Sequence, residues 1–378
     1  MSRVTLGDVA IERKETLKGS KAGLPTVGLE HLIPKQITLT TWGNGSENTF
    51  SKVFHKGQVL FGRRRAYLKK AAVAPFDGLC SGDITVIEAK ADLILPELLP
   101  LIIQNDAFFD YAVGKSAGSL SPRVKWEHLK KYEFELPDMA EQRKLAELLW
   151  SMVEAKEAYQ ELLRQTDELI NAQFIEMFGD PVDNPLSWSV LPLTQVGTCK
   201  NGMNFSSKES GVTIRCLGVA DFQDNATIRD MSKLPLISLN EMPPDEYLLQ
   251  DGDIAFVRSN GNKALVGRCL TVYPGNVPVT YSGFCIRFRT RNDLLLIDYL
   301  LRFFKIESVR SKMAGRGANI QNLNQQILSS LQVPVPPIDM QEKYVSFVRQ
   351  TDKSKFELRQ AIRSLETIYK QILLENLG

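Results

Sequence analysis

The sequence has no long hydrophobic run and no marked excess of either charge. Its most apolar stretch, residues 92–103, is interrupted by Pro96, Glu97 and Pro100, so we expect no membrane span. The first residues lack the apolar core of a secretory signal, which favours a cytoplasmic protein. The net charge is only +2, so the composition does not indicate a nucleic-acid-binding protein. A nucleic-acid-binding surface would have to come from local clusters of basic residues.

The cysteines show neither metal-binding nor disulfide patterns. There are five, an odd number, and no two have Cys-x-x-Cys spacing; they are Cys80, Cys199, Cys216, Cys269 and Cys285. Both facts argue against a zinc site and against a disulfide framework. We expect all five to be small buried side chains in a reducing compartment, and we expect no metal site.

An internal repeat is the strongest signal in the sequence. Pro137 precedes Gln142 by five positions, and Pro336 precedes Gln341 in the same way, 199 positions later. Each pair opens a long run without proline or glycine. The two runs end at Gly179 and Gly378, which are again 199 positions apart. Segments upstream match less strictly, at offsets between 187 and 201, which indicates two equal helices that follow two divergent globular parts.

The two runs predict long helices with a heptad-like apolar stripe. Steps of three and four residues alternate along both runs, as a coiled-coil contact requires. The predicted helix–helix seam consists of Leu148, Met152, Ala155, Tyr159, Leu162, Leu169, Phe347, Leu358, Ala361, Leu365 and Ile368. A helix of about 40 residues is roughly 60 Å long and cannot bury such a stripe alone. We predict an antiparallel coiled coil; in the alternative, each helix packs only on its own globular domain.

The predicted fold class is α+β, with a pseudo-twofold internal repeat. Two mixed α/β domains, 1–136 and 180–335, are joined by a central helix over 137–179 and followed by a C-terminal helix over 336–378. Strand-like segments such as Gln58 to Phe61 and Ile254 to Val257 alternate with loops rich in glycine, asparagine and serine. Shorter helices are predicted at Pro96 to Tyr111 and at Leu294 to Met313.

This duplicated arrangement resembles the specificity subunit of Type I restriction-modification systems over essentially the whole chain. The resemblance rests on the two Pro-x-x-x-x-Gln motifs that open long helices, and on similar domain openings at Leu6-Gly7-Asp8-Val9 and Leu193-Thr194-Gln195-Val196. The second motif departs from the family at Met340, where an acidic residue is usual.

The resemblance implies a non-catalytic DNA-recognition subunit that serves in phage defence. Each globular part would be a target-recognition domain that reads one half of an asymmetric bipartite site in double-stranded DNA. The paired helices would set the spacer and dock two modification subunits, which methylate adenine with S-adenosylmethionine. Restriction/translocase subunits would use ATP and Mg²⁺. No cofactor would be bound by this chain itself.

Candidate DNA-binding residues follow from base and phosphate chemistry. Arginine and lysine recognise guanine and phosphate, whereas asparagine and glutamine recognise adenine. The candidates in the first domain are Arg63, Arg64, Arg65, Tyr67, Lys69, Lys115, Ser119 and Arg123. Those in the second are Arg258, Asn260, Asn262, Lys263, Arg316, Asn319 and Gln321.

Two other functions compete with this interpretation. Asp77, Glu88 and Lys90 imitate the carboxylates and lysine of a Mg²⁺-dependent nuclease, although the second domain has no equivalent set. A coiled-coil scaffolding protein without DNA specificity is the other alternative. We found neither a catalytic methyltransferase motif nor a credible phosphate-binding loop, so no catalytic residue is predicted.

Overall fold

The computed structural model describes residues 2–19, 23–44, 49–222, 226–291, 293–314 and 322–377. The chain divides into two compact units. Unit 1 consists of Met1–Glu161 and Leu358–Gly378, and unit 2 consists of Leu162–Glu357. Each unit therefore contains one globular part and a portion of both long helices. Within the described residues, no helix is both long enough and apolar enough to cross a membrane.

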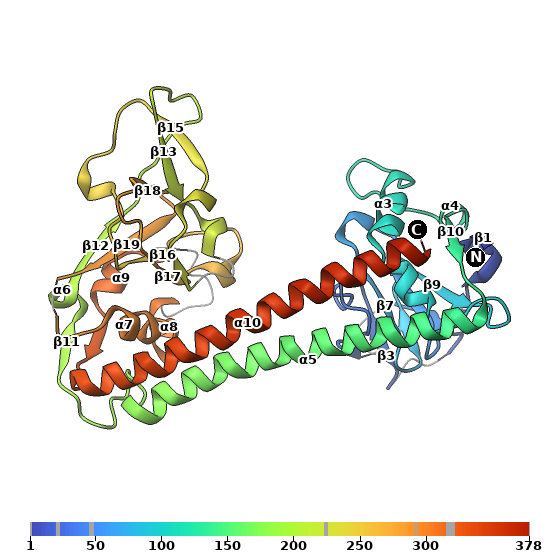
Figure 1. Ribbon diagram of the computed structural model, residues 1–378, viewed down its shortest axis with the longest axis horizontal. Coiled ribbons are helices and arrows are strands. Elements are labelled where there is room, and N and C mark those ends of the chain that lie inside the picture. Colours follow the sequence, from blue (N-terminus) through green and yellow to red (C-terminus); the bar gives the residue numbers. More distant parts are fainter. Residues whose placement is uncertain are drawn as a thin grey trace. The chain divides into compact units, whose positions relative to one another are not determined.

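Unit 1 contains two four-stranded sheets and a two-stranded sheet (Figure 1). The first has the order β2 (Ala10–Arg13), β9 (Ile84–Ala89), β6 (Val59–Gly62), β7 (Ala71–Val73). The second has the order β4 (Gly43–Asn44), β3 (Pro25–Val27), β8 (Gly78–Cys80), β5 (Lys52–Phe54). In the third, β1 (Ser2–Thr5) pairs antiparallel with β10 (Glu133–Leu136), which joins the start of the domain to the segment just before the long helix.

Unit 2 repeats the strand order of the main sheet with one added strand, and its second sheet has three strands among the described residues where unit 1 has four. Its main sheet runs β12 (Gly197–Asn201), β19 (Cys285–Thr290), β16 (Asp253–Val257), β17 (Cys269–Val272), β14 (Thr227–Ile228). The second sheet runs β15 (Leu236–Leu239), β13 (Val212–Leu217), β18 (Val279–Tyr281). Strand β11 (Val190–Pro192) pairs with β20 (Gln332–Pro334), as β1 does with β10. The parallel pair β13–β18 matches the parallel pair β3–β8 of unit 1.

Short helices and 3-10 turns connect these strands. In unit 1 they are α1 (Leu6–Val9), the 3-10 turn η2 (Ala66–Leu68), α2 (Leu99–Ile103), α3 (Asp106–Gly114) and α4 (Trp126–Leu129). In unit 2 they are α6 (Leu193–Val196), α7 (Ile297–Phe303), α8 (Glu307–Ala314), α9 (Gln325–Ser329) and the 3-10 turns η3 (Val219–Phe222), η4 (Met231–Lys233), η5 (Asp245–Tyr247) and η6 (Lys263–Leu265). The single helices predicted over 96–111 and 294–313 are each two helices. In unit 1 the break falls at Asn105, whose side chain caps α3 by accepting from the Ala107 N–H.

The long helices are α5 (Met139–Phe178) and α10 (Ile338–Leu377), each of 40 residues. The glutamine of each helix-opening motif is buried and binds the globular part. Gln142 accepts a 2.8 Å bond from the Leu95 N–H and donates to the Pro137 carbonyl at 2.9 Å. Gln341 accepts from the Leu296 N–H and donates to the Pro336 carbonyl, both at 2.9 Å. The motif therefore fixes each helix start against the loop before α2 or α7.

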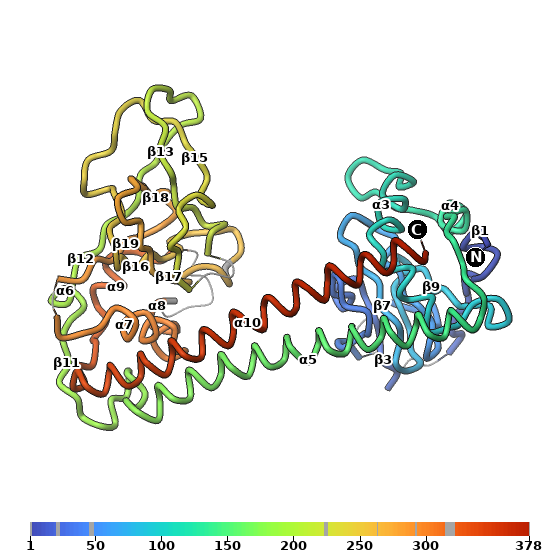
Figure 2. Tube along the Cα trace, viewed as in Figure 1, coloured from blue at the N-terminus to red at the C-terminus, as the bar shows by residue number. Residues whose placement is uncertain are grey.

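Each unit buries faces of both long helices in its core. In unit 1 the core includes Leu145 and Leu149 of α5 together with Leu373 and Leu377 of α10. In unit 2 it includes Ile170, Phe174 and Phe178 of α5 together with Tyr344 and Val348 of α10. The Tyr344 hydroxyl donates to the Ile170 carbonyl at 3.1 Å. The trace shows these portions of α5 and α10 side by side within each unit, with their chain directions opposed (Figure 2).

The predicted seam is one residue out of register at several positions. Met152 is buried, and Ala155, Tyr159, Phe347, Leu358, Ala361 and Leu365 are partly buried. In contrast, Leu148, Leu162, Leu169 and Ile368 are about half exposed, so placing them in the seam was wrong. Leu149 and Ile170 are the buried residues beside two of them. Because two apolar stripes run one residue apart along α5, spacing alone did not distinguish the inward one.

Candidate nucleic-acid interface

Three loops of unit 1 are joined by backbone hydrogen bonds where β6 ends. The Arg63 N–H donates to the Asp83 carbonyl at 3.0 Å, and the Val124 N–H donates to the Arg63 carbonyl at 3.0 Å. The Arg65 N–H donates to the Pro122 carbonyl at 2.8 Å. The loop from Ala117 to Arg123 is closed by two further backbone bonds of 3.0 and 2.9 Å. These bonds hold the predicted residues 63–65, 119 and 123 in one place.

Asp83 organises the charge of this surface. Its carboxylate accepts from Arg123 Nε at 2.7 Å and lies 3.5 Å from Arg64 Nη1. The hydrogen bond from Arg123 holds the pKa of Asp83 below its ordinary value, so the carboxylate stays ionised. Arg64 Nη2 also donates to the Ser121 hydroxyl at 3.0 Å. Two guanidinium groups thus share one carboxylate and retain a net positive charge, in fixed orientations suited to phosphate or guanine.

The other candidates of unit 1 have mixed surroundings. The Arg63 side chain is partly buried, and its Nε has no hydrogen-bond partner among the residues that the structure describes. Arg65, Tyr67, Lys115 and Ser119 are exposed, with Lys115 Nζ 5.6 Å from the centre of the Tyr111 ring. Lys69 is held by carboxylates instead: its Nζ lies 2.7 Å from Asp106 and 3.6 Å from Asp110. Lys69 is therefore a structural ion-pair residue in this conformation.

An apolar residue in this surface was missed by the sequence analysis. Leu120, at the tip of the loop from Ala117 to Arg123, is 90% exposed, the largest exposure among the large hydrophobic residues described. Its neighbours Ser119 and Ser121 gave no pattern that would single it out. A single exposed leucine is not unusual by itself, but Leu120 places an accessible apolar side chain beside Arg64 and Arg123.

Unit 2 has the same backbone framework with different side chains. The Arg258 N–H donates to the Phe284 carbonyl at 2.8 Å, and the Leu323 N–H donates to the Arg258 carbonyl at 2.7 Å. Phe284 stands where Asp83 stands in unit 1 and is 59% exposed. Arg258 Nη1 donates to the Gly283 carbonyl at 3.3 Å. This surface therefore presents an aromatic ring beside one guanidinium group.

The asparagines of unit 2 have turn-forming roles. The side-chain oxygen of Asn260 accepts from the Asn262 N–H at 2.7 Å, and that of Asn262 accepts from the Ala264 N–H at 3.1 Å. Asn260 is partly exposed and lines a shallow pocket together with Phe284, whereas Asn262 is exposed. The remaining predicted residues lie outside the described part of the chain: Arg316, Asn319, Gln321 and the side chain of Lys263.

The residues of the nuclease alternative do not form one site. Glu88 is bound by Arg13 through two bonds of 2.8 and 2.7 Å. Lys90 Nζ donates to backbone carbonyls of α1, whereas Asp77 accepts from the Lys56 N–H at 2.7 Å. Each group has its own set of partners, so the spacing does not create a carboxylate pair. No group of three or more metal-ligating side chains occurs among the residues that the structure describes.

The five cysteines are free, and four of them are buried. Burial raises the pKa of the Cys80, Cys199 and Cys216 thiols to about 12. Thiols this weakly acidic are not nucleophiles near neutral pH.

Comparison with known proteins finds similarity to Type I restriction-modification specificity subunits. Residues 185–367 match the family model described as the Type I restriction modification DNA specificity domain. The specificity subunit of the type I restriction enzyme EcoKI from Escherichia coli (strain K12) is 23% identical over 281 residues, covering 68% of this chain and 60% of that protein. That of StySPI from Salmonella potsdam is 24% identical over 288 residues, with the same coverages. The matches thus span less than two thirds of these relatives.

Solved structures share the fold over nearly the whole chain. The S subunit of a Type I restriction-modification system from M. genitalium has a TM-score of 0.54 and 14% identity, covering 100% of this chain and 96% of that one. A chain from a study of complex assembly and conformational transition of the type I R-M system has a TM-score of 0.56 and 19% identity, covering 99% and 97%. The chain is thus similar in sequence to Type I restriction-modification specificity subunits, and the family model covers residues 185–367 of it.

Proposed function

We propose that the chain is the non-catalytic DNA-reading subunit of such a system. The observation that carries the proposal is the loop framework shared by units 1 and 2. In both, the residue after the β6 or β16 segment bonds to the same two neighbouring loops through its backbone, while the side chains differ. A shared frame with unlike side chains suits two modules that read two different half-sites.

The long helices support a fixed separation between the two modules. Each unit incorporates the beginning of one helix and the end of the other, with opposed chain directions. We propose that α5 and α10 form an antiparallel coiled coil over their length and that the chain is an internal duplication with pseudo-twofold symmetry. The helices would then set the spacer between half-sites, and equivalent surfaces would dock two methyltransferase subunits.

The partners would supply the chemistry. Two modification subunits would bring S-adenosylmethionine, and restriction/translocase subunits would bring ATP and Mg²⁺. This chain would recognise the sequence of the double-stranded DNA site. The proposed contacts in unit 1 are Arg64, Arg65, Arg123 and the apolar tip Leu120; those in unit 2 are Arg258, Asn260 and Phe284. Arginine suits guanine and phosphate, and apolar tips suit thymine methyl groups.

The test is genome-wide mapping of N6-methyladenine after co-expression of the chain with its methyltransferase partner. We expect a split motif. Arg64→Ala should relax bases in one half only, at a cost of about 1–3 kcal/mol per lost base contact, and Phe284→Ala should affect only the other half. Arg3→Ala, which removes an exposed arginine paired with Glu133 on strand β1, is the matched control and should leave both halves unchanged. An unsplit motif, or loss of both halves from either loop variant, would contradict the proposal.

The scaffolding alternative predicts a different outcome. A coiled-coil adaptor without DNA specificity would give no reproducible methylated motif, and the purified complex would bind unrelated duplexes equally. A salt titration of binding adds a second measurement. Removing one phosphate-contacting cation such as Arg65 should reduce the slope of log K against log salt by about 1, for every DNA sequence tested.

A further inference from the structure

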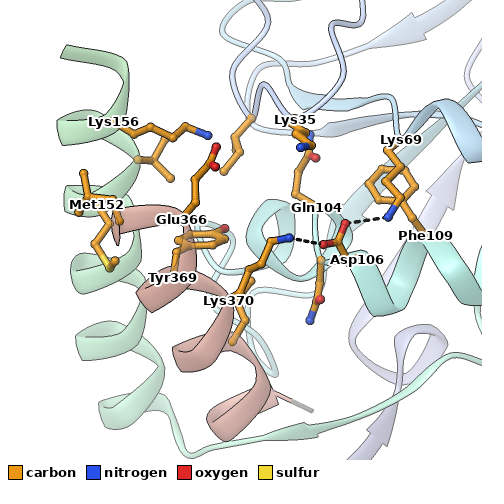
Figure 3. A pocket seen from close by; sticks show the side chains of 15 residues that line it. Lys35, Lys69, Gln104, Asp106, Phe109, Met152, Lys156, Glu366, Tyr369 and Lys370 are labelled. Atoms are coloured by element: carbon orange, nitrogen blue, oxygen red, sulfur yellow. Dashed lines mark hydrogen bonds and ion pairs between the residues drawn. The ribbon is translucent and has the colours of Figure 1, made fainter. Parts of the chain in front are cut away.

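Unit 1 contains a cavity of about 100 Å³ that the proposed DNA surface does not use (Figure 3). It lies between α3, the C-terminal end of α2, and the faces of α5 and α10 that belong to unit 1. Apolar side chains form part of its lining, among them Ile37, Phe109, Val153 and Leu373. An apolar cavity of 150 Å³ in another protein holds benzene, so this space, which opens to solvent, suits most of one aromatic ring.

The rim of the cavity carries an excess of positive charge. Four lysines line it, Lys35, Lys69, Lys156 and Lys370, against two acids, Asp106 and Glu366. Asp106 binds Lys69 at 2.7 Å and Lys370 at 2.8 Å, and the hydrogen bond from Lys370, followed by that from Lys69, lowers the pKa of Asp106 to about 2.

The remaining charges of the rim are not paired with one another. Within the described residues, neither Lys35 nor Lys156 has an ion-pair partner within 4.0 Å. Figure 3 shows the Lys156 and Glu366 side chains on adjacent helices beside the cavity. The rim can therefore accept an anion without first breaking an ion pair.

The cavity also contains an unsatisfied polar group. The Tyr369 hydroxyl is buried and has no hydrogen-bond partner among the described residues. Burial raises the pKa of Tyr369, so the neutral phenol is available as a donor or an acceptor. A buried hydroxyl without a partner is unfavourable, and a ligand atom that bonded to it would remove that penalty.

The equivalent charged positions in unit 2 are paired with each other. Lys355 and Asp167, which lie 199 positions from Lys156 and Glu366, form an ion pair. Lys355 is buried, and the neighbouring Asp352 accepts from Arg302 at 3.3 Å. The two equivalent pairs therefore differ. Lys355 and Asp167 form an ion pair in unit 2, whereas Lys156 and Glu366 do not form one in unit 1. The unpaired charges at the rim of the unit 1 cavity are therefore not a consequence of the shared fold.

We infer that this cavity binds a small aromatic anion. The ring would lie on the apolar lining, a carboxylate or phosphate would lie between Lys35 and Lys156, and a polar atom of the ring system would bond to Tyr369. The site is separate from the loops proposed to read DNA, and the inference does not depend on that function.

Isothermal titration of the full chain without DNA tests the site with defined probes. Adenosine monophosphate and benzoate both combine a ring with an anionic group, whereas adenosine and inorganic phosphate each carry one half. We expect saturable binding of at least one complete probe, roughly tenfold or more tighter than either half, because each charged hydrogen bond contributes substantially. Binding of adenosine monophosphate alone would identify a nucleotide site, and binding of benzoate alone an aromatic carboxylate site. Binding of neither, or of phosphate as tightly as the complete probes, would overturn the inference.

Two conservative variants locate the binding. Lys156→Met keeps the apolar stem and removes the charge, and Tyr369→Phe keeps the ring and removes the hydroxyl. Each should weaken binding by roughly tenfold. Lys144→Met removes an exposed lysine of the same helix outside the cavity and should have no effect. Tyr369→Phe should unfold at no lower temperature than the parent, which separates lost binding from lost folding. Unchanged affinity in both cavity variants would contradict the assignment.

Discussion

The two units have the same strand order in their main sheets but stabilise it with different polar chemistry. In unit 2, Asp253 of β16 is buried and binds Arg289 of β19 through two bonds of 2.8 and 2.7 Å. The matching positions of unit 1 hold Gln58, just before β6, and Glu88 of β9. Gln58 donates to Glu88, which Arg13 also binds near the surface. The shared architecture therefore requires a partnered polar pair at this place, but not a particular charge.

The loops that we propose to face DNA show the same contrast. Asp83 binds two arginines in unit 1, whereas Phe284 occupies its place in unit 2. The exchange of a carboxylate for an aromatic ring leaves the loop positions intact because the bonds that join the loops are made by the backbone. The side chains of these loops can therefore change without loss of the hydrogen bonds that hold the loops together.

The largest expected difference between the units comes from the buried ion pair. Asp253→Ala leaves the Arg289 guanidinium without its carboxylate in the interior, at a cost of about 3–5 kcal/mol in the free energy of unfolding of unit 2. Gln58→Ala, at the matching place in unit 1, should cost about 1–3 kcal/mol: the His55 N–H loses its acceptor, but Glu88 keeps Arg13 and is nearer to solvent. Hydrogen exchange followed by mass spectrometry measures each unit separately. Equal costs in the two units would show that the buried pair is not the stronger support.

The helix-opening glutamines should give intermediate and equal effects. Gln142→Ala leaves the Leu95 N–H and the Pro137 carbonyl without partners, and Gln341→Ala does the same to Leu296 and Pro336. Each loss should cost about 1–3 kcal/mol, since unsatisfied buried groups are expensive. Thermal unfolding and hydrogen exchange of the two variants should therefore agree closely. Gln160→Ala, on the exposed face of α5, is the control and should be neutral. If only one of the two substitutions lowered the free energy of unfolding strongly, the two glutamines would not have equivalent roles in the two units.

The sequence predicted the parts of the fold that depend on local pattern. The absence of proline and glycine predicted both long helices to within two residues of their ends, because helix breakers act locally. The repeated motif predicted where those helices begin, and the structure gives its physical reason in the two buried glutamines. The segments 96–111 and 294–313 were each predicted as one helix, but each contains two. The pattern did not reveal the break at Asn105, because that break carries no proline or glycine.

The parts that depend on tertiary contacts were predicted less well. Leu162 and Leu169 fit a heptad as well as their neighbours do, and only packing in the folded units distinguishes them. Lys69 belongs to a basic run in the sequence, yet α3 brings Asp106 and Asp110 to it. Asp83 lies 40 positions from Arg123, so no local pattern could have shown their ion pair.

The smallest expected difference is the response of the two units to acid. Asp106 in unit 1 has a folded pKa of about 2, below its ordinary value of 3.8, because Lys370 and Lys69 bind the carboxylate. Its stabilisation is therefore fully present above pH 4 and is lost as the pH falls toward 2. The carboxylate is partly exposed, so solvent reduces the effect to roughly 0.5–1 kcal/mol. In unit 2 the first residue of the matching helix α8 is Glu307, which has no ion-pair partner within 4.0 Å among the described residues and so lacks this support. Hydrogen exchange of unit 1 at pH 6 and pH 3 should show this loss in the parent and not in Asp106→Asn.

Asp339→Asn removes an exposed carboxylate 3.9 Å from Lys343 on α10 and should leave the loss unchanged. If the parent and Asp106→Asn lost the same stability, the ion pairs around Asp106 would not be what makes unit 1 the acid-sensitive half.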